Sequence, residues 1–158
     1  MLAQTEQKIL DFILNSWEFK SSPVRHPKEE NLFLIGYTSE GREEALLLPL
    51  SPEEAKLAAL HQIENFLNKE LPAPLAKSVE LSPFLEVLFS IRVYLGNSFF
   101  KSEIFKRLLQ GQSLGFANFK NFLLLELNKI DYKVQQRLFS SSWAALRKKE
   151  LAYLKGEF

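Results

Sequence analysis

Apolar residues are concentrated most strongly in residues 84–95, where Glu86, Ser90 and Arg92 are the only polar side chains. At the roughly 100° per residue of an α-helix, Glu86 and Ser90 lie with Asn97 on one narrow seam, and apolar side chains cover most of the remaining surface. Arg92 stands alone among these apolar positions. This pattern predicts a buried helix, around which we expect the rest of the chain to pack.

The residues at the two ends of this stretch are typical of helix boundaries. Ser82 can cap a helix, Pro83 suits a first helical position, and Gly96 can adopt the left-handed conformation just past the end. The three polar residues are all at even-numbered positions, so they would also share one face of a β-strand. The boundary residues and the length of the stretch favour a helix.

Further helices are predicted from apolar residues at three- and four-residue spacing and from capping residues. The first is capped by Thr5 and ends near Trp17. The clearest boundary is residues 51–54, where a serine cap precedes a proline and two acidic residues at the positive end of the helix dipole. After the central helix, Ser102 caps a helix that stops at Gly111. Helical spacing begins again at Phe116, continuing to Leu127, and then at Asp131 and Ser142.

Two apolar runs, residues 31–37 and 44–48, flank a glycine-containing turn at 38–42 and predict a β-hairpin. Because a two-stranded hairpin is marginal alone, we expect it to pack on helices or to pair with a strand that the pattern does not reveal. An edge left open would instead allow a partner to add a strand. Residues 20–30, with two prolines and many charged side chains, are predicted to form a loop, and His26 within it is expected to be solvated.

The fold class that these patterns predict is mainly α, with a helical bundle-like core and one small β-hairpin in the N-terminal half. Residues 71–81 contain two prolines and are predicted to link an acidic helix–hairpin–helix lobe, residues 1–70, to a basic, phenylalanine-rich helical lobe, residues 82–158. We expect both to be lobes of a single domain, residues 1–158, because a 158-residue chain with 46% hydrophobic residues can bury one substantial core.

Composition excludes several classes of protein and site. The chain has no cysteine, which excludes disulfides, thiolate metal sites and a cysteine nucleophile. No apolar run approaches the roughly 18 residues of a membrane span, and the N-terminus lacks the features of a secretory signal. We therefore expect a soluble, cytoplasmic protein without a membrane partner.

Charge is distributed unevenly along the chain, although the net charge is only +1. Residues 1–100 carry 9 Lys or Arg against 14 Asp or Glu, and residues 101–158 carry 11 against 5. Such asymmetry indicates contact with nucleic acid or with an acidic partner, unless the two parts neutralise each other within the fold. The candidate nucleic-acid-binding residues are nine cations of the basic part: Lys101, Lys106, Arg107, Lys129, Lys133, Arg137, Arg147, Lys148 and Lys149.

Phosphate binding requires such cations to share one surface, and Tyr132 and Trp143, which lie among them in the sequence, are able to stack on exposed bases. The sequence leaves a second interpretation open. In that interpretation the cations form a solvated helical surface, and the two aromatic side chains belong to the core.

Two motifs that resemble catalytic signatures have simpler explanations. Residues 111–115 match the G-x-S-x-G pattern of a nucleophile elbow, but the preceding segment is predicted to be helical and both histidines precede Ser113. We therefore interpret them as a helix–helix turn. Acidic doublets at 29–30, 43–44 and 53–54 are interpreted as solvated charge, because adjacent side chains point in different directions.

Residues 103–127 have the segment lengths of a helix-turn-helix, with Asn118, Lys120 and Asn121 as potential base or phosphate contacts. Apolar residues nearly surround the axis of the second helix, so we expect a buried helix instead of a recognition helix. The sequence contains no glycine-rich phosphate loop and no cluster of residues at metal-ligand spacing, and it predicts neither a cofactor nor a metal.

The function expected from these features is that of a non-catalytic accessory protein that contacts nucleic acid through its basic C-terminal helical lobe, as a small subunit of a nucleoprotein complex would. The first alternative is a protein–protein adaptor or scaffold subunit without nucleic-acid contact, docking through the acidic lobe or through apolar positions such as Leu124 and Leu125. The second alternative is a small enzyme whose site the sequence does not reveal. The sequence predicts neither the identity of the partner nor the oligomeric state.

Overall fold

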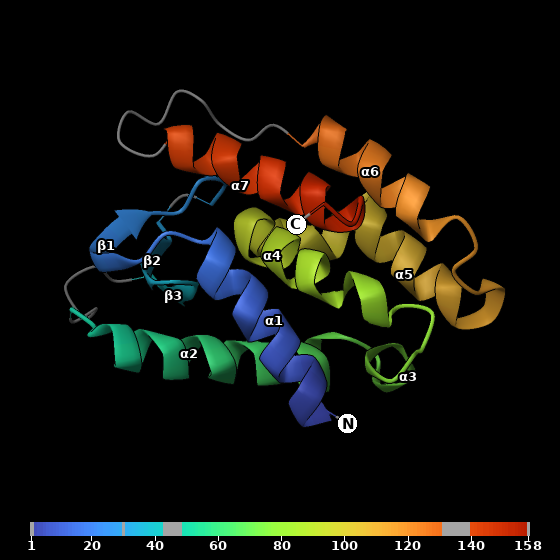
Figure 1. Cartoon of the computed structure of the whole chain (residues 1–158), viewed down its shortest axis with the longest axis horizontal. Helices are drawn as coiled ribbons and strands as arrows, with labels where there is room; N and C mark the ends of the chain where they lie inside the picture. Colours follow the sequence, from blue (N-terminus) through green and yellow to red (C-terminus); the bar gives the residue numbers. More distant parts are fainter. Residues whose placement is uncertain (1, 30, 43–48, 131–139, 158) are drawn as a thin grey trace.

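The structure, a computed structural model, describes residues 2–29, 31–42, 49–130 and 140–157 of the 158-residue chain. The described residues form seven α-helices and one three-stranded antiparallel sheet, which confirms a mainly α fold with a small β element in the N-terminal half (Figure 1). The α-helices are α1 (Leu2–Ser16), α2 (Pro52–Asn65), α3 (Ala73–Ala76), α4 (Leu85–Leu95), α5 (Glu103–Leu114), α6 (Phe119–Lys129) and α7 (Ser140–Leu154). The strands are β1 (Lys20–Arg25), β2 (Phe33–Gly36) and β3 (Ser39–Gly41), and the shorter helical segments are η2 (Phe66–Glu70), η3 (Ser82–Phe84) and η4 (Gly96–Lys101).

Helix α4 lies in the centre of the core, as its apolar pattern predicts. Leu88 and Ile91 are 0% exposed, and α1 and α7 pack against the helix (Figure 1). Gly96 ends α4 with a φ of 65°, as expected. The start differs from the prediction, because the short helix η3 precedes α4 and the Ser82 side chain makes no capping hydrogen bond.

The polar seam of α4 is buried and is hydrogen-bonded to helices from both ends of the chain. Ser90 Oγ accepts a hydrogen bond from Trp17 Nε1 just after α1 (2.9 Å) and donates one to Glu150 Oε2 of α7. One turn earlier, Glu86 Oε2 accepts a hydrogen bond from the Tyr153 hydroxyl of α7. These bonds fix the positions of α1 and α7 on α4, because a buried polar group without a partner is costly.

Local capping predicts the start of α2 correctly and the start of α1 incorrectly. Ser51 Oγ accepts a hydrogen bond from Glu54 N (3.1 Å), and the Glu54 carboxylate accepts one from Ser51 N (2.9 Å), which completes a capping box. Helix α1 already begins at Leu2, so Thr5 lies inside the helix and is not its cap. Its end at Ser16 agrees with the prediction.

The sheet contains three strands in the order β1-β2-β3 instead of the predicted two. Strand β1 occupies part of the predicted loop and pairs with β2, with Val24 opposite Leu34. Strand β3 occupies part of the predicted turn, with Ser39 opposite Ile35. Residues 44–48, the predicted second strand, lie outside the described residues.

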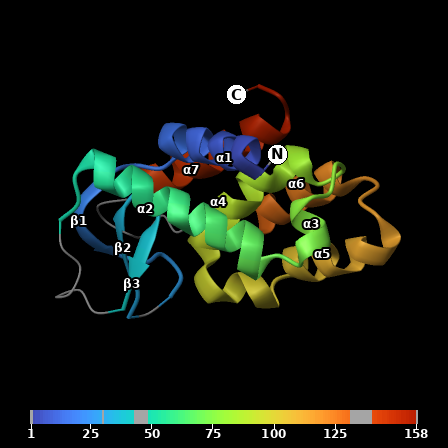
Figure 2. The same cartoon turned by 90° about the horizontal axis from the view of Figure 1, so that it is seen from below.

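The sheet packs on α2 at a glycine (Figure 2). Gly36, the last residue of β2, has a φ of +67°, and a Cβ at this position would come within 2.9 Å of Ala55 Cβ. The close approach and the positive φ both require glycine at this position.

His26 is not the solvated loop residue that the sequence predicts. It is only 5% exposed, and its Nε2 lies 2.7 Å from the carbonyl oxygen of Val93 in α4. Its Nδ1 accepts hydrogen bonds from the backbone N–H groups of Lys28 and Glu29 (both 3.0 Å). Because Nδ1 is an acceptor, the ring is neutral and carries its proton on Nε2, which donates to Val93. The residue therefore anchors the β1–β2 connection on the central helix.

Helix α5 begins at the predicted cap but does not stop at Gly111. The Ser102 hydroxyl accepts a hydrogen bond from a backbone N–H of the first turn (3.2 Å). Gly111 is buried inside the helix, and a Cβ there would come within 2.2 Å of the Phe116 ring. Gly115, with a φ of +77°, is the residue that ends the helix. Gly111 is thus needed for the packing of Phe116 and not for a left-handed turn.

One hydrophobic core cluster contains residues from Ile9 to Leu154. It includes Leu71, Leu75 and Leu81 from the segment that the sequence predicts to be a linker. The division into two lobes stays a prediction. Among the described residues, no helix combines the length and the apolar character that crossing a bilayer requires.

Candidate functional site

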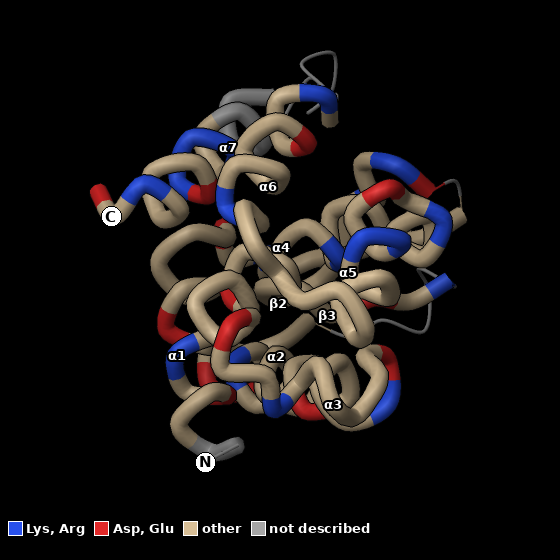
Figure 3. The backbone as a smooth tube through the Cα atoms, turned by 90° about the vertical axis from the view of Figure 1, so that its right-hand side faces the viewer, with Lys and Arg blue, Asp and Glu red and all other residues tan. Residues whose placement is uncertain are grey.

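The described candidate cations lie in two separate parts of the structure. The first part is η4 with α5, which carries Lys101, Lys106 and Arg107. The second is α6 with α7, which carries Lys129, Arg147, Lys148 and Lys149. Figure 3 shows the basic segments of α7 at the upper left and those around α5 at the right. The remaining candidates, Lys133 and Arg137, lie outside the described residues, as do Tyr132 and the side chain of Trp143.

In the α5 group, Arg107 has a structural role. Its guanidinium lies 5.6 Å and 5.8 Å from the ring centroids of Phe116 and Phe119, and it donates a hydrogen bond to the carbonyl of the glycine that ends α5 (3.0 Å). Lys106 forms an ion pair with Glu103 (2.9 Å) and remains 62% exposed. Arg107 therefore holds the α5–α6 turn together, which leaves Lys101 and Lys106 as the accessible cations of this group.

In the α6–α7 group, a hydrogen bond connects the two helices. Arg147 Nη2 donates to Asn128 Oδ1 (2.9 Å), so the middle of α7 lies against the end of α6. Lys129 follows Asn128 directly, forms an ion pair with Glu126 (2.9 Å) and is 72% exposed. Arg147 and Lys129 are therefore neighbours on one surface.

Two further candidate cations follow Arg147 on α7. Lys148 is exposed, and Lys149 Nζ donates a hydrogen bond to the Asn15 carbonyl oxygen at the end of α1 (2.9 Å). Arg147 reaches α6 and Lys149 reaches α1, so these two side chains leave α7 in different directions. We call the four candidate cations carried by α6 and α7 the α6–α7 basic surface: Lys129, Arg147, Lys148 and Lys149.

The ion pairs between described residues do not join the acidic part of the chain to the basic part. In residues 101–158 each pair links residues three positions apart on one helix, Lys106 with Glu103 and Lys129 with Glu126. The other pairs join Arg42 and Arg92 to glutamates within residues 1–100.

Helix α6 is not the buried helix that its apolar composition predicts. Phe119, Leu123 and Leu127 are buried, but the opposite face of the helix is exposed, and Leu125 on that face is 63% exposed. The other exposed residues of the helix are Lys120, Asn121, Asn128 and Lys129, and Asn118 just before it is exposed as well. In Figure 1, α5 runs out to the right-hand end of the molecule and α6 returns in the opposite direction. The two helices therefore form a hairpin and not the steeply crossed pair of a helix-turn-helix.

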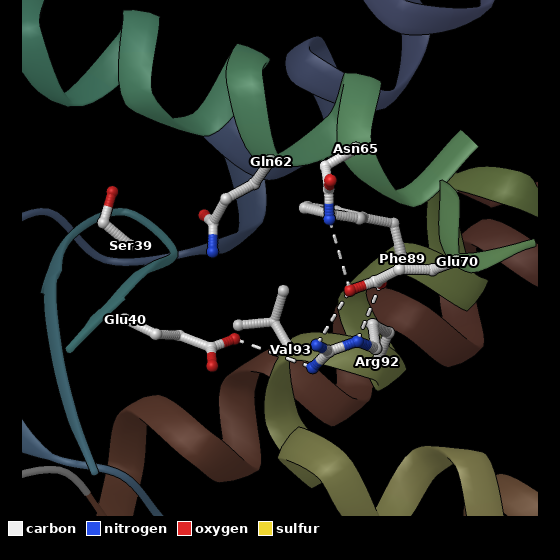
Figure 4. Close-up of a pocket in the computed structure, with 8 residues that line it drawn as sticks. All are labelled: Ser39, Glu40, Gln62, Asn65, Glu70, Phe89, Arg92 and Val93. Atoms are coloured by element: carbon white, nitrogen blue, oxygen red, sulfur yellow. Dashed lines mark hydrogen bonds and ion pairs between the residues drawn. The ribbon is translucent and has the colours of Figure 1, made fainter. Parts of the chain in front are cut away.

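A polar pocket of about 280 Å³ lies between β3, the α2–η2 helix and α4 (Figure 4). Arg92 lies at its centre, with a side chain that is only 11% exposed. Arg92 Nε donates to Glu70 Oε1 (2.9 Å), Nη1 lies 3.6 Å from Glu40 Oε1, and the guanidinium lies 5.0 Å from the ring centroid of Phe100. The pocket residues are Ser39, Glu40, Gln62, Asn65, Glu70, Phe89, Arg92 and Val93. We call this site the Arg92 pocket.

The chemistry of the Arg92 pocket is that of a structural ion-pair cluster. Burial raises the pKa of Glu40, and the adjacent Arg92 opposes this shift. The guanidinium is held between two carboxylates from segments 30 residues apart in the sequence, Glu40 and Glu70, and thereby ties the sheet and η2 to α4. Sequence reasoning missed this cluster, because nothing in the local pattern around Arg92 identifies its distant partners.

The remaining candidate for chemistry, the serine of the G-x-S-x-G pattern, lies on a helix. Ser113 is exposed in the last turn of α5, and its hydroxyl donates to the Gln110 carbonyl oxygen (3.3 Å). A nucleophile elbow requires a strand-to-helix turn, which this segment does not have. Within the described ranges, no group of three or more His, Asp or Glu residues is arranged to hold a metal ion.

Comparison of the chain with family models, with curated proteins and with solved structures found no match.

Proposed function

We propose that this protein is a non-catalytic accessory protein that contacts nucleic acid through the α6–α7 basic surface. The observation that carries the proposal is that Lys129 and Lys148 are exposed on two helices that contact each other. The ion pairs in this part are local, and none of those between described residues reaches an acidic residue of the first 100.

The α6–α7 basic surface has the chemistry that phosphate recognition uses. Lysine ammonium groups bind phosphate as point charges, and asparagine amides donate hydrogen bonds to phosphate or to base edges. The exposed face of α6 carries Asn121 and Lys129, and Arg147 connects the end of this helix to α7 through Asn128, whose amide already donates to the Leu124 carbonyl oxygen. Such a surface holds the sugar–phosphate backbone and reads little sequence, so we expect weak preference among base sequences.

Two charge-reversal variants test the proposal against the other basic group. Lys129→Glu with Lys148→Glu changes the α6–α7 basic surface, and Lys101→Glu with Lys106→Glu changes the α5 group by the same amount of charge. All four lysines are exposed, so both variants should fold. At low salt we expect the first pair to weaken binding to single- or double-stranded nucleic acid by about tenfold or more, and the second pair to weaken it only about two- to threefold.

The same titration distinguishes the competing class of function. If both variants lose affinity equally, the binding reflects net charge and the α6–α7 basic surface is not the site. If the wild-type protein binds no nucleic acid at low salt, a protein adaptor takes the place of the proposal. The exposed leucines Leu114 (75% exposed) and Leu125 (63%) would then be the residues to test for docking.

A further inference from the structure

A cavity of about 530 Å³ lies between the first half of α1, α3 and the start of α4, and we call it the α1–α3 cavity. Figures 1 and 2 both show the N-terminal end of α1 beside α3. Ala76, Val79 and Pro83 form an apolar wall, and Val79 is 87% exposed although it is a large apolar side chain. Cavities of roughly 300–1,000 Å³ with apolar walls and a few polar groups are typical of small-molecule sites.

Two lysines give the α1–α3 cavity its positive charge. Lys8 belongs to α1 and Lys77 directly follows α3, and both are exposed. No hydrogen bond or ion pair between described residues engages either ammonium group. The exposed residue Ser82 also lines the cavity, and its hydroxyl makes no capping hydrogen bond. The polar groups that are free to reach a ligand here are therefore hydrogen-bond donors, and two of them are cations.

Glu86 is the acidic residue among the described residues that line this cavity, and its carboxyl group is withdrawn from it. The residue is 4% exposed, its Oε2 accepts the hydrogen bond from Tyr153, and its Oε1 is buried as well. Burial raises the pKa of Glu86, against the opposing effects of the Tyr153 hydrogen bond and the charge of Lys8. The charge that is open to the α1–α3 cavity is therefore positive.

We propose that the α1–α3 cavity binds a small amphipathic anion, a carboxylate with an apolar body. The carboxylate accepts hydrogen bonds from Lys8 and Lys77, whose flexible four-carbon stems allow both ammonium groups to reach one anion. The apolar body packs on Val79 and Pro83. A carboxylate fits better than a neutral acceptor, because hydrogen bonds with ionised partners are roughly twice as strong as those between neutral groups. The proposal does not depend on the α6–α7 basic surface, whose residues do not line this cavity.

Phenylacetate and 2-phenylethanol test this proposal, because they share the apolar ring and differ in the carboxylate. Titration of the full chain at low salt, followed by NMR chemical shifts, should show phenylacetate binding about tenfold more tightly than the alcohol. Lys8→Gln combined with Lys77→Gln should reduce this preference to less than about twofold. Lys56→Gln combined with Lys69→Gln is the matched control, since it removes the same charge from α2 and η2, outside the cavity, and it should keep the preference. All four lysines are exposed, so both double variants should fold.

A further variant tests the apolar wall separately from the charge. Val79→Ser changes an exposed residue and should weaken both probes by the same factor, while the preference for the anion remains. The proposal is overturned if the alcohol binds as tightly as phenylacetate, or if millimolar phenylacetate shifts no resonance of the cavity. It is also overturned if the Lys8 and Lys77 variant keeps the preference, or if the Lys56 and Lys69 variant loses it to the same extent, since the effect would then be one of net charge alone.

Discussion

The buried cations Lys20 and Arg92 and the exposed lysine Lys129 on α6 have different roles in the structure. Lys20 is 7% exposed and donates to the carbonyl oxygens of Glu18 (2.5 Å) and Tyr37 (3.1 Å), and the side chain of Arg92 is 11% exposed between two carboxylates. Lys129, by contrast, is 72% exposed and has only a local ion pair among the described residues. Lys20 and Arg92 hold parts of the fold together, whereas the ammonium group of Lys129 remains open to solvent.

Removing Arg92 should have the largest effect on stability. Arg92→Met leaves Glu40 and Glu70 without their counter-ion, and removing one partner of a buried ion pair costs about 3–5 kcal/mol. Because both carboxylates are about one-fifth exposed, we expect the lower end of this range in urea unfolding at neutral pH. Lys148→Met is the matched control and should change the free energy of unfolding by less than about 0.5 kcal/mol. Equal effects of the two substitutions would abolish the distinction between structural and surface cations.

The burial of Lys20 should be visible as a pH dependence of stability. Burial lowers the pKa of Lys20 from 10.5 to about 8. Between these pH values the unfolded chain binds a proton that the folded protein does not bind, so the free energy of unfolding rises as the pH increases from about 8 to 10.5. This pKa difference between the unfolded and the folded state corresponds to a rise of about 3 kcal/mol in the free energy of unfolding. Lys20→Met should remove this rise, and a variant whose stability follows the wild-type curve over this range would contradict the buried position.

His26 should give a smaller dependence at acid pH. Burial lowers the pKa of His26, and protonation of Nδ1 would also break the hydrogen bonds from Lys28 and Glu29. As the pH falls below 6.5, the unfolded chain binds the proton first, so stability decreases until the folded pKa is reached. His26→Gln should remove this decrease. His61→Gln, at an exposed position on α2, should leave the decrease in stability unchanged. If His61→Gln removed the decrease and His26→Gln kept it, the buried contact of His26 with α4 would be contradicted.

The surface ion pairs should contribute least. Lys106→Ala and Lys129→Ala each break one ion pair between residues three positions apart, and exposed pairs of this kind are worth about 0.3–0.5 kcal/mol. The Lys106 pair is exposed at both ends, whereas Glu126 is only 13% exposed, so Lys129→Ala should have the larger effect of the two. Thermal unfolding should therefore change little in either variant. A loss above about 1 kcal/mol in one of them would mean that this lysine has a structural role, as Arg107 has.

Sequence reasoning predicts the elements whose signals are local. Helix α2 follows from the cap at Ser51, and α4 follows from twelve residues that are almost entirely apolar. Strand β3 was missed because it consists of Ser39, Glu40 and Gly41, residues that favour turns. Its pairing with β2 supplies the hydrogen bonds that overcome this preference, and such pairing is not a local property.

The candidate site shows the same limit. The sequence identifies the cations, but only the contact between Arg147 and Asn128 places Lys129 beside α7. The burial of His26 and Arg92 depends on partners more than 20 residues away in the sequence. The local pattern of charges and prolines therefore suggested a solvent-exposed side chain for His26. The apolar pattern around Arg92 gave no indication of its partner. In α6 the apolar composition suggested burial, whereas its position at the surface leaves Leu125 exposed.

The salt dependence of nucleic-acid binding tests most directly whether the surface cations bind phosphate. If the four cations of the α6–α7 basic surface contact about four phosphates, the log–log slope of the binding constant against salt concentration should be about −3.6 for duplex DNA and about −2.8 for a single strand. Replacing Lys129 and Lys148 together by Glu should reduce the slope to about half of these values, because two phosphate contacts are lost. A wild-type slope near zero, or a slope that this variant leaves unchanged, would contradict the account.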